Sequence, residues 1–580
     1  MRQWMVAAKK ADFYAIAEKF HVDPVVARII RNREVIGEKN IRIYLGGNLS
    51  DLSDPHQMKD MDRLVEILAQ KIRKQAHIRI IGDYDVDGVT SSHLFLTALR
   101  RVGAKVDVVI PHRIQDGYGL SLHLLQQAKE DGVDTILTCD NGIAAIDEIA
   151  WAKAQKMTVL VTDHHAVPFE EHEGRRTEKK SLADAVVNPH QQDCRYPYKE
   201  LCGAGVAWNV IRVLYENYDM DKREAEDLLD FVAMATVCDV MSLTGENRIL
   251  VKEGLKRIRH TKNIGLQALM QACNVQPENI SAYHFGYVLG PCVNATGRLD
   301  TARHALRLFE TGQETEAEEI ARDLVDLNQE RKELTLQGVE MAKKLCEEGG
   351  YENDPVLVLF LPDVHESIAG LIAGRIREMY NRPVFVLTRG EEGVKGSGRS
   401  TENYSMYENM CGCAELFTKF GGHPMAAGLS LPEENVEKFR RKINENCPLT
   451  VEEVCPDIHI DMAMPVGYAS TELVHQFALL EPFGKDNPSP LFADRNLSIS
   501  RMWVIGKNRN VLRMSVLSEY GQPVPVIFFG DVETLFAYFT EKFGQKEVEN
   551  ALHGRKNRIL FSMVYTCLLY TSDAADEEDS

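Results

Sequence analysis

The sequence of 580 residues lacks the features of membrane and secreted proteins. No apolar run approaches the roughly 18–20 residues that a membrane-spanning helix needs. The first residues carry scattered charges and no small-residue cleavage pattern, so we expect no signal peptide. Apart from Cys411 and Cys413 the 12 cysteines are scattered, and they form no paired C-x-x-C zinc framework. This pattern predicts reduced thiols in a cytoplasmic protein.

Positive charge is also scarce in the chain. The formal net charge is −19, from 67 Lys and Arg against 86 Asp and Glu. This balance argues against a protein whose whole surface binds nucleic acid, although a local basic channel remains compatible with it. Hydrophobic residues make up 44% of the chain, which allows several buried cores. At roughly 150 residues per domain, the length predicts about three to four domains.

Short apolar runs alternate with helical stretches from about Ile78, as in a parallel sheet with crossover helices. A stretch without proline, with apolar residues at helical spacing, follows this region and predicts a long helix. The later part of the chain alternates apolar and polar residues in short runs, as in a small antiparallel barrel. We expect an α/β protein with these parts: a helical arm (1–45), a catalytic domain (46–312), a connecting helix (313–350), a smaller α/β domain (351–450) and an OB-like barrel (455–565).

The last residues, 566–580, begin apolar, end acidic and break the strand pattern. We expect this tail to be non-native sequence. We therefore expect the barrel to be truncated, without its last strand or strands.

Acids and histidines follow three of the predicted strands. In parallel sheets, ligands bind at the carboxyl ends of the strands. Side chains at positions i and i+2 of an extended segment point the same way. The three groups are Asp83, Asp85 and Asp87 after IRII, Asp140 after TILTC, and Asp163, His164 and His165 after TVLVT. Each group alone is compatible with a polar turn. Together, at the ends of successive strands, they predict a metal site.

Two of the motifs allow alternative interpretations. DYDVDG also resembles the start of a calcium loop, but Leu94 stands where that loop needs Glu. Asp239, after the apolar run MATVC, is either a further ligand or a helix cap.

Carboxylates and imidazole without thiolate favour Mn²⁺ or Mg²⁺ over structural zinc. Five or six ligands exceed the needs of one ion, so we expect two ions about 3.5–4 Å apart that share a carboxylate and drive phosphoryl displacement.

The ordered motifs DYDVDG, CDNG, DHH and VCDVM resemble those of the DHH phosphoesterases. GGHPMAAG, residues 421–428, is similar to the Gly-rich motif of the associated DHHA1 domain. Within this superfamily the chain resembles the single-strand-specific DNA exonucleases over about residues 5–565, including PCVNATGRL, HESIAGLIAGRI, GSGRS and LEPFGKDNPSPLF. The resemblance implies a parallel-sheet DHH domain, a long helix, a DHHA1 domain and an antiparallel OB-like barrel.

The same resemblance implies an activity and site residues. The activity is metal-dependent 5′→3′ degradation of single-stranded DNA to mononucleotides, in DNA repair and recombination. The implied metal ligands are Asp85, Asp87, Asp140, His164 and Asp239, with Asp140 bridging the ions. The implied catalytic residues are Asp83, which supports or ligates the metals, and His165, which contacts the scissile phosphate or acts as an acid.

A second set of residues is expected to bind the strand. His423 follows glycines that let the backbone approach a phosphate, and its imidazole can donate to a non-bridging oxygen; the alternative is an exposed turn histidine. The resemblance implies a pocket for the 5′-terminal phosphate, made by Arg298, Ser397, Arg399 and Gly422. Within the barrel region, bases and backbone are expected to contact Phe483, Lys485, Trp503, Lys507 and Arg513. Phe483 and Trp503 are as compatible with a core position.

Other functions fit the sequence less well. A DHH phosphodiesterase for short oligoribonucleotides or cyclic dinucleotides is the main alternative, but those relatives are shorter and lack the barrel. A pyrophosphatase is disfavoured for the same reason, and a non-catalytic scaffold because every expected ligand is present. Single-stranded DNA is the expected substrate and no membrane is involved. Single-strand-binding protein and a RecQ-type helicase are partners implied by resemblance only.

Overall fold

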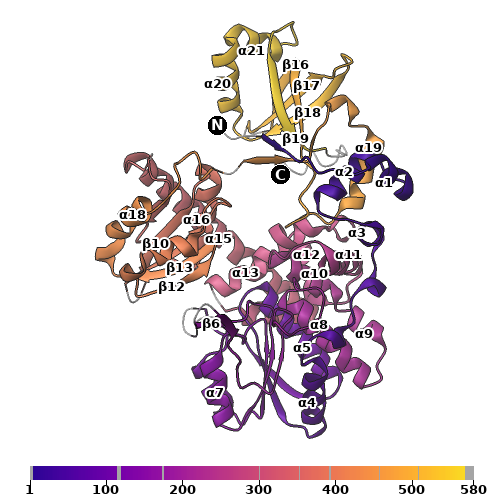
Figure 1. Ribbon diagram of the computed structural model, residues 1–580, viewed down its shortest axis with the longest axis vertical. Coiled ribbons are helices and arrows are strands. Elements are labelled where there is room, and N and C mark those ends of the chain that lie inside the picture. Colours follow the sequence, from indigo (N-terminus) through magenta and orange to yellow (C-terminus); the bar gives the residue numbers. More distant parts are fainter. Residues whose placement is uncertain are drawn as a thin grey trace. The chain divides into compact units, whose positions relative to one another are not determined.

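The computed structural model describes residues 4–113, 116, 119–172, 175–299, 301–351, 353–390, 393–455, 457–506 and 509–567 (Figure 1). The described residues form two compact units. One comprises residues 47–455 and 484–486, and the other comprises 4–46, 457–483 and 487–567. Among the described helices, none combines the length and the apolar character needed to cross a membrane.

The first unit begins with a five-stranded parallel sheet. Its strand order is β3 (Lys105–Val109), β2 (His77–Ile81), β4 (Thr135–Cys139), β5 (Thr158–Thr162) and β8 (Ala185–Val187). The central strands are buried on both faces, which explains why their sequences are continuous apolar runs rather than alternating ones. A short antiparallel pair, β6 (Phe169–His172) and β7 (Arg175–Glu178), lies between β5 and β8 in the chain.

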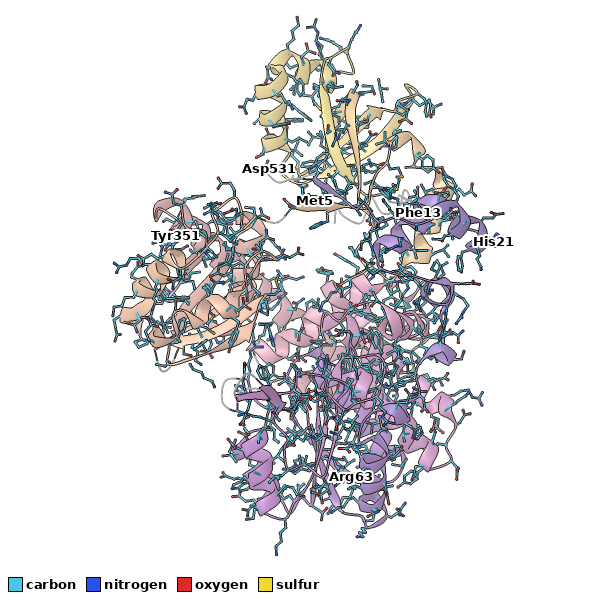
Figure 2. The ribbon with its side chains drawn as sticks, viewed as in Figure 1. Met5, Phe13, His21, Arg63, Tyr351 and Asp531 are labelled. Atoms are coloured by element: carbon cyan, nitrogen blue, oxygen red, sulfur yellow. The ribbon has the colours of Figure 1, made fainter. Side chains whose placement is uncertain are left out.

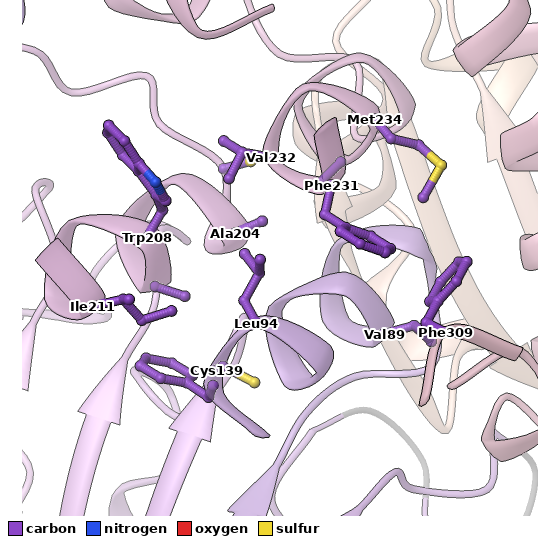
Figure 3. Packing of buried hydrophobic residues seen from close by; sticks show 14 of the residues in the cluster. Val89, Leu94, Cys139, Ala204, Trp208, Ile211, Phe231, Val232, Met234 and Phe309 are labelled. Carbon is purple, nitrogen blue, oxygen red and sulfur yellow. The ribbon is translucent and has the colours of Figure 1, made fainter. Parts of the chain in front are cut away.

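Helices cover both faces of this sheet. One face contributes to a core cluster shared with α4 (Met61–Arg73), α5 (Val86–Arg101), α8 (Gly203–Asn217) and α10 (Leu229–Cys238). Figure 3 shows part of this cluster, in which the Phe231 and Phe309 ring centroids lie 5.0 Å apart. The other face packs against α6 (Leu122–Glu130) and α7 (Ile146–Ala154). This two-sided cover leaves the strand ends as the place where polar side chains gather.

The rest of this domain is helical. Its further helices are α9 (Lys222–Glu226), α11 (Gly245–Ile258), α12 (Ile264–Ala272), the π-helical turn η4 (His284–Leu289), α13 (Gly290–Leu299) and α14 (Arg303–Glu310). The predicted long helix is α15 (Glu314–Glu348). Its second half packs on α16 (Glu366–Tyr380), so closely that a Cβ at Gly338 would lie 2.3 Å from Ile372 Cδ1.

A second, mixed sheet follows α15. Its order is β12 (Lys419–His423), β13 (Ala426–Leu431), β11 (Gly393–Arg399), β10 (Val384–Gly390) and β9 (Leu357–Phe360). Only β9 and β10 are parallel. Helices α17 (Met406–Cys411) and α18 (Val436–Glu445) complete this domain. Tyr351 also lies here (Figure 2), with the Arg440 guanidinium 3.6 Å from its ring centroid.

The second unit contains a curled sheet of the OB type. The strands β15 (Met462–Ala463), β16 (Phe492–Ile505), β17 (Val511–Leu517) and β18 (Pro523–Phe529) are neighbours in that order, and β19 (Leu560–Tyr565) pairs with β16. All these pairs are antiparallel except β15 with β16. The helices α20 (Val532–Phe543) and α21 (Gln545–Leu552) interrupt the barrel region, which the sequence pattern had predicted as strands and turns only.

The N-terminal arm belongs to this second unit. It contains α1 (Phe13–Phe20), α2 (Pro24–Asn32) and α3 (Glu38–Gly46), which share a core cluster with α19 (Thr471–Phe477). The arm is not purely helical, because β1 (Trp4–Val6) pairs in parallel with β14 (Ile458–Ile460). A buried ion pair between Arg33 and Asp461, with two hydrogen bonds of 2.7 and 3.0 Å, joins the two segments. Most of the predicted non-native tail, residues 568–580, lies outside the described residues, so the truncation of the barrel stays a prediction.

Candidate metal centre and phosphate-binding residues

The loop between β2 and α5 carries three of the predicted site residues. Asp85 caps α5, since its side chain accepts a hydrogen bond from the Gly88 backbone N–H at 3.0 Å. A Cβ at Gly88 would lie 2.5 Å from the Asp83 backbone nitrogen, so only glycine lets the loop fold back this tightly. Asp87 lies in the first turn of α5 and accepts hydrogen bonds from Gly203 N (2.6 Å) and Ala204 N (2.7 Å). These donors begin α8, and the positive end of that helix favours the carboxylate.

Asp140 follows β4 in the left-handed backbone region, with φ of 60°. The start of α8 packs against it, because a Cβ at Gly203 would lie 2.6 Å from Asp140 Cβ. Asp239 forms the C-cap of α10. This position agrees with the helix-cap hypothesis and is also compatible with a role as a metal ligand. The carboxylates of the first two motifs and of α10 reach one cluster from separate segments.

Asp163, after β5, orients the histidines that follow it. Its carboxylate accepts hydrogen bonds from the backbone N–H groups of Ile143 (2.8 Å), His164 (2.7 Å) and His165 (3.1 Å), and from His165 Nδ1 (2.8 Å). Burial alone would raise the pKa of Asp163, but these donors and the neighbouring imidazoles lower it. Asp163 belongs to one of the three predicted acid and histidine groups, but it was not among the expected ligands or catalytic residues. Its direct adjacency to two histidines was the signal available.

His164 is the point where the acids converge. Its Nε2 lies 3.1 Å from Asp140 Oδ1, 3.6 Å from Asp239 Oδ2 and 3.7 Å from Asp87 Oδ2. Ligand atoms lie within 4.8 Å of one another in three groups: Asp83, Asp85 and Asp140; Asp87, His164 and Asp239; and Asp140, His164 and His165. All five predicted ligands and Asp83 therefore share one cluster.

The carboxylates of this cluster are buried together. Burial and then mutual repulsion raise the pKa values of Asp83, Asp140 and Asp239 well above the usual range for aspartate. Asp83 Oδ1 is buried and has no hydrogen-bond partner among the described residues, which costs about 1–3 kcal/mol. Oxygen-rich sites with imidazole suit Mn²⁺ and Mg²⁺. The donor set thus fits the two divalent ions expected from the sequence.

Three arginines form a second cluster, here called the arginine cluster: Arg113, Arg298 and Arg399. Arg298 lies on α13 and donates to the Ser367 carbonyl at 2.6 Å, and Arg399 ends β11 and donates to the Gly398 carbonyl at 2.8 Å. Burial and then the charges of neighbouring arginines lower the pKa of Arg399, and they lower that of Arg298 to about 10. None of the three makes an ion pair with a carboxylate within the described part of the chain. Cations held together in this way favour an anionic ligand.

Arg113 was absent from the predicted site. It follows β3, and its guanidinium lies 4.8 Å from the ring centroid of Tyr84, between two of the acidic residues in sequence. Burial first, then repulsion by Asp83, raises the pKa of Tyr84 to about 12. An arginine in the segment PHRIQDGYG carries no distinctive local signal, so the sequence could not select it.

The remaining residues predicted to bind the DNA strand are Ser397, Gly422 and His423. Ser397 and Arg399 both border α16, since a Cβ at Gly370 would lie 3.5 Å from Ser397 Cβ and 3.0 Å from Arg399 Nη2. Gly422 has φ of 154°, and His423 is exposed at the end of β12. Among the described residues, no hydrogen bond or ion pair joins Gly422 or His423 to the acids or to the arginine cluster. Their roles stay predictions.

The predicted contacts of the barrel region differ in position. Trp503 pairs with Arg513 across β16 and β17, and the guanidinium carbons of Arg501 and Arg513 lie 5.7 and 5.4 Å from its ring centroid. Phe483 is partly buried against the core that the arm shares with α19, as the core reading predicted. Lys485 does not belong to the barrel unit: its carbonyl accepts from the Leu243 N–H at 2.9 Å, in the unit of the metal centre. Lys507 lies outside the described residues.

Comparison with protein families first defines the class. The DHH family, N-terminal domain, matches residues 77–236 and the DHHA1 domain matches 353–447. With the acidic cluster at the strand ends, these matches make the chain a DHH phosphoesterase. The RecJ OB domain matches residues 460–564.

Individual relatives narrow the class further. The single-stranded-DNA-specific exonuclease RecJ of Haemophilus influenzae is 34% identical over 518 residues, which are 86% of this chain and 88% of that protein. RecJ of Bacillus subtilis is 33% identical over 512 residues, 88% of this chain but only 63% of that longer protein. Crystal structures of Thermus thermophilus RecJ with Mn²⁺ and with Mg²⁺ match with TM-scores of 0.77 and 0.71, at 27% and 26% identity, over 91% of this chain and 74% and 73% of theirs. The chain belongs to the RecJ family.

Proposed function

We propose that this protein degrades single-stranded DNA from its 5′ end to mononucleotides, in DNA repair and recombination. One observation carries the proposal: the ligand atoms of Asp83, Asp85, Asp87, Asp140, His164 and Asp239 converge within groups of 4.8 Å. Family membership supports the substrate, because the curated relatives are named for single-stranded DNA. The alternative, a phosphodiesterase for short oligoribonucleotides or cyclic dinucleotides, has no comparable support.

The acidic cluster is the proposed place of bond cleavage. Asp85, Asp87, Asp140, His164 and Asp239 would hold two Mn²⁺ or Mg²⁺ ions, which when bound supply hydroxide at neutral pH and stabilise charge on the phosphate. Hydrogen bonds within the chain orient two of these ligands: Asp85 caps α5, and two amides of α8 bind Asp87. Preorganised ligands of this kind spare the reaction a reorganisation cost.

His165 is the proposed contact of the scissile phosphate. Asp163 binds its Nδ1 at 2.8 Å, so we assign the contact with a phosphate oxygen to Nε2. The same carboxylate binds the backbone N–H groups of both histidines, which fixes the direction of the turn. A fixed imidazole donor beside the ligand His164 suits a residue that contacts the substrate at the reacting bond.

The arginine cluster, with Ser397, is the proposed site of the 5′-terminal phosphate. It adjoins the acidic loop: α13, which carries Arg298, packs so closely on that loop that a Cβ at Gly297 would lie 2.4 Å from the Tyr84 carbonyl oxygen. A terminal phosphate carries more negative charge than an internal one, so three guanidinium groups favour the strand end. Anchoring the end beside the metal ligands puts the next phosphodiester bond at the site of cleavage. This arrangement supports 5′→3′ direction and mononucleotide products.

End-labelled digestion tests the proposal. With Mn²⁺ or Mg²⁺ we expect a 5′-labelled single strand to release labelled mononucleotide first, and a 3′-labelled strand to be shortened faster with a 5′-phosphate than with a 5′-hydroxyl. A double-stranded substrate of the same sequence and a cyclic dinucleotide should be cut far more slowly. Equal release from both ends, or preference for the cyclic dinucleotide, would contradict it.

Partners and location are part of the proposal. Resemblance suggests that single-strand-binding protein and a RecQ-type helicase act with this enzyme in the cytoplasm. Co-purification of the full chain with each candidate, with and without single-stranded DNA, tests these assignments. Loss of both associations in the absence of DNA would mean that only the substrate joins them.

A further inference from the structure

Two cysteine thiols lie in contact beside the proposed active site. Cys273 forms the C-cap of α12 and Cys292 lies in the first turn of α13, and their Sγ atoms are 3.8 Å apart. Both are free thiols. A disulfide needs an S–S distance of about 2.05 Å, so the two sulfur atoms must approach by nearly 2 Å. Cys292 is buried and Cys273 is half-buried, which leaves access from the Cys273 side.

The Cys292 sulfur has both an acceptor and a donor beside it, and its S–H donates to the Val288 carbonyl at 3.3 Å. The Cys292 Sγ accepts from Asn328 Nδ2 at 3.4 Å, and the Asn328 amide is held by Arg331 through bonds of 2.8 and 3.1 Å. The hydrogen bond with Cys273 lowers the pKa of Cys292, burial opposes this, and the charges of Lys332 and Arg331 support it. The pKa of Cys273 is raised by the same hydrogen bond. Of the two thiols, Cys292 is therefore the one that loses its proton more readily, and a thiolate is the reactive form of cysteine.

The helix that carries Cys292 also contacts both halves of the site. Asn294 Oδ1 accepts from the Val86 N–H at 3.2 Å, between the ligands Asp85 and Asp87 in sequence. Gly297 packs on the Tyr84 carbonyl, and Arg298 belongs to the arginine cluster. A displacement of α13 therefore reaches the metal ligands and the phosphate-binding residues together.

We propose that Cys273 and Cys292 form a reversible disulfide on exposure to a peroxide, and that this disulfide reduces the nuclease activity by displacing α13. The effect on activity rests on the proposed function, whereas formation of the disulfide does not. In the first step the Cys292 thiolate attacks a peroxide oxygen: an S–O bond forms, the O–O bond breaks, and the leaving hydroxide or alkoxide takes a proton from solvent and departs as water or alcohol. In the second step Cys273 attacks the sulfenic sulfur: the S–S bond forms, the S–O bond breaks, and water leaves with the Cys273 proton. Thiols restore the reduced pair.

Peptide mass measurement tests the disulfide directly. No Lys or Arg lies between Asn263 and Arg298, so trypsin releases both cysteines in one peptide. After hydrogen peroxide, then catalase and an alkylating reagent, we expect the wild-type peptide to be two hydrogens lighter and to take up no reagent. Dithiothreitol before alkylation should restore two adducts. A peptide that stays fully alkylated after peroxide overturns the proposal.

Activity is measured on the same samples with full-length enzyme and Mn²⁺. A shift of about 1 Å in catalytic geometry costs on the order of 100-fold in rate, so we expect peroxide to lower wild-type cleavage roughly tenfold or more, reversibly. Cys273→Ser cannot form the bond and should keep its activity; Cys273→Ala is a second variant should serine unfold the protein. Cys411→Ser, which removes an exposed thiol, should respond like wild type. Two results would contradict the proposed effect on activity. One is an equal peroxide-induced loss of activity in Cys273→Ser, and the other is a disulfide that forms in the wild type without a change in activity. If the reduced enzyme cleaves no DNA, the proposed function fails while the peptide result still stands.

Discussion

The substitution Asp140→Asn tests whether the site is a set of charges held together for metal. Asp140 is buried, and burial and the charges of Asp87, Asp85, Asp239 and Asp83 raise its pKa well above the usual range. Two unit charges 4.8 Å apart, the spread of each ligand group, repel by about 3–4 kcal/mol at an effective dielectric constant of ~20. Asparagine keeps the shape and removes the charge. Because the remaining carboxylates still repel one another, we expect the metal-free variant to be more stable by about 2 kcal/mol, or roughly 2–4 °C in Tm for a unit of this size.

The assay is thermal unfolding of full-length wild type and variant in chelator and in Mn²⁺. Ions that bind only the folded state at 100 times their Kd stabilise by about 2.7 kcal/mol, so the wild-type Tm should rise with Mn²⁺. The variant lacks the proposed bridging ligand, so its Tm should rise little and its cleavage of single-stranded DNA should be abolished. Metal therefore reverses the order of stability of the two proteins.

Asp163→Asn is the matched control. The same chemical change is made in the same site, but Asp163 accepts four hydrogen bonds from within the chain, and its pKa is lowered. Hydrogen bonds to a charged group contribute about 1.5–3 kcal/mol, so this variant should be less stable than wild type in chelator. The reasoning is refuted if metal-free Asp140→Asn melts at or below the wild-type temperature, or if both variants shift in the same direction.

Three further predictions concern other parts of the chain. Arg399→Gln should reduce the preference for a 5′-phosphate over a 5′-hydroxyl by about 10–100-fold in kcat/KM, since a charged hydrogen bond contributes about 1.5–3 kcal/mol; an unchanged ratio would exclude Arg399 from the pocket. Trp503→Ala should weaken single-strand binding by about 1–3 kcal/mol in a titration and leave cleavage of a dinucleotide unchanged; equal effects on both substrates would point to misfolding. Burial raises the pKa of Asp230 to about 6, against a bond from Thr261, so the folded state holds the proton more tightly than the unfolded state. Stability should therefore fall by up to about 3 kcal/mol as pH rises from about 4 to 6, and Asp230→Asn should remove that part of the slope in denaturant titrations; identical slopes in both proteins would contradict the assignment.

The location of the metal centre could be predicted from the sequence because its causes are local. Buried parallel strands are short apolar runs, and their carboxyl ends meet at one edge of the sheet, so Asp85, Asp140 and His164 could be assigned to one site without coordinates. The long helix, α15, was predicted for the same kind of reason, since a stretch of 35 residues without proline and with helical spacing has few alternatives.

The tertiary structure decided which distant groups meet. Asn294 lies 208 positions from Val86, and the amides of Gly203 and Ala204 lie more than a hundred positions from Asp87, so no local pattern joins them. Arg113 and the contact of Cys273 with Cys292 likewise depend on how helices pack. Periodicity reports which face of an element is buried, but not which neighbour buries it. For this protein, the sequence alone determined that candidate ligands lie at the ends of neighbouring parallel strands. Long-range packing decided the rest: the amides that bind the ligands, the arginine cluster, and the position of Lys485 in the unit of the acidic cluster. These contacts join residues far apart in the chain, so no local pattern predicts them.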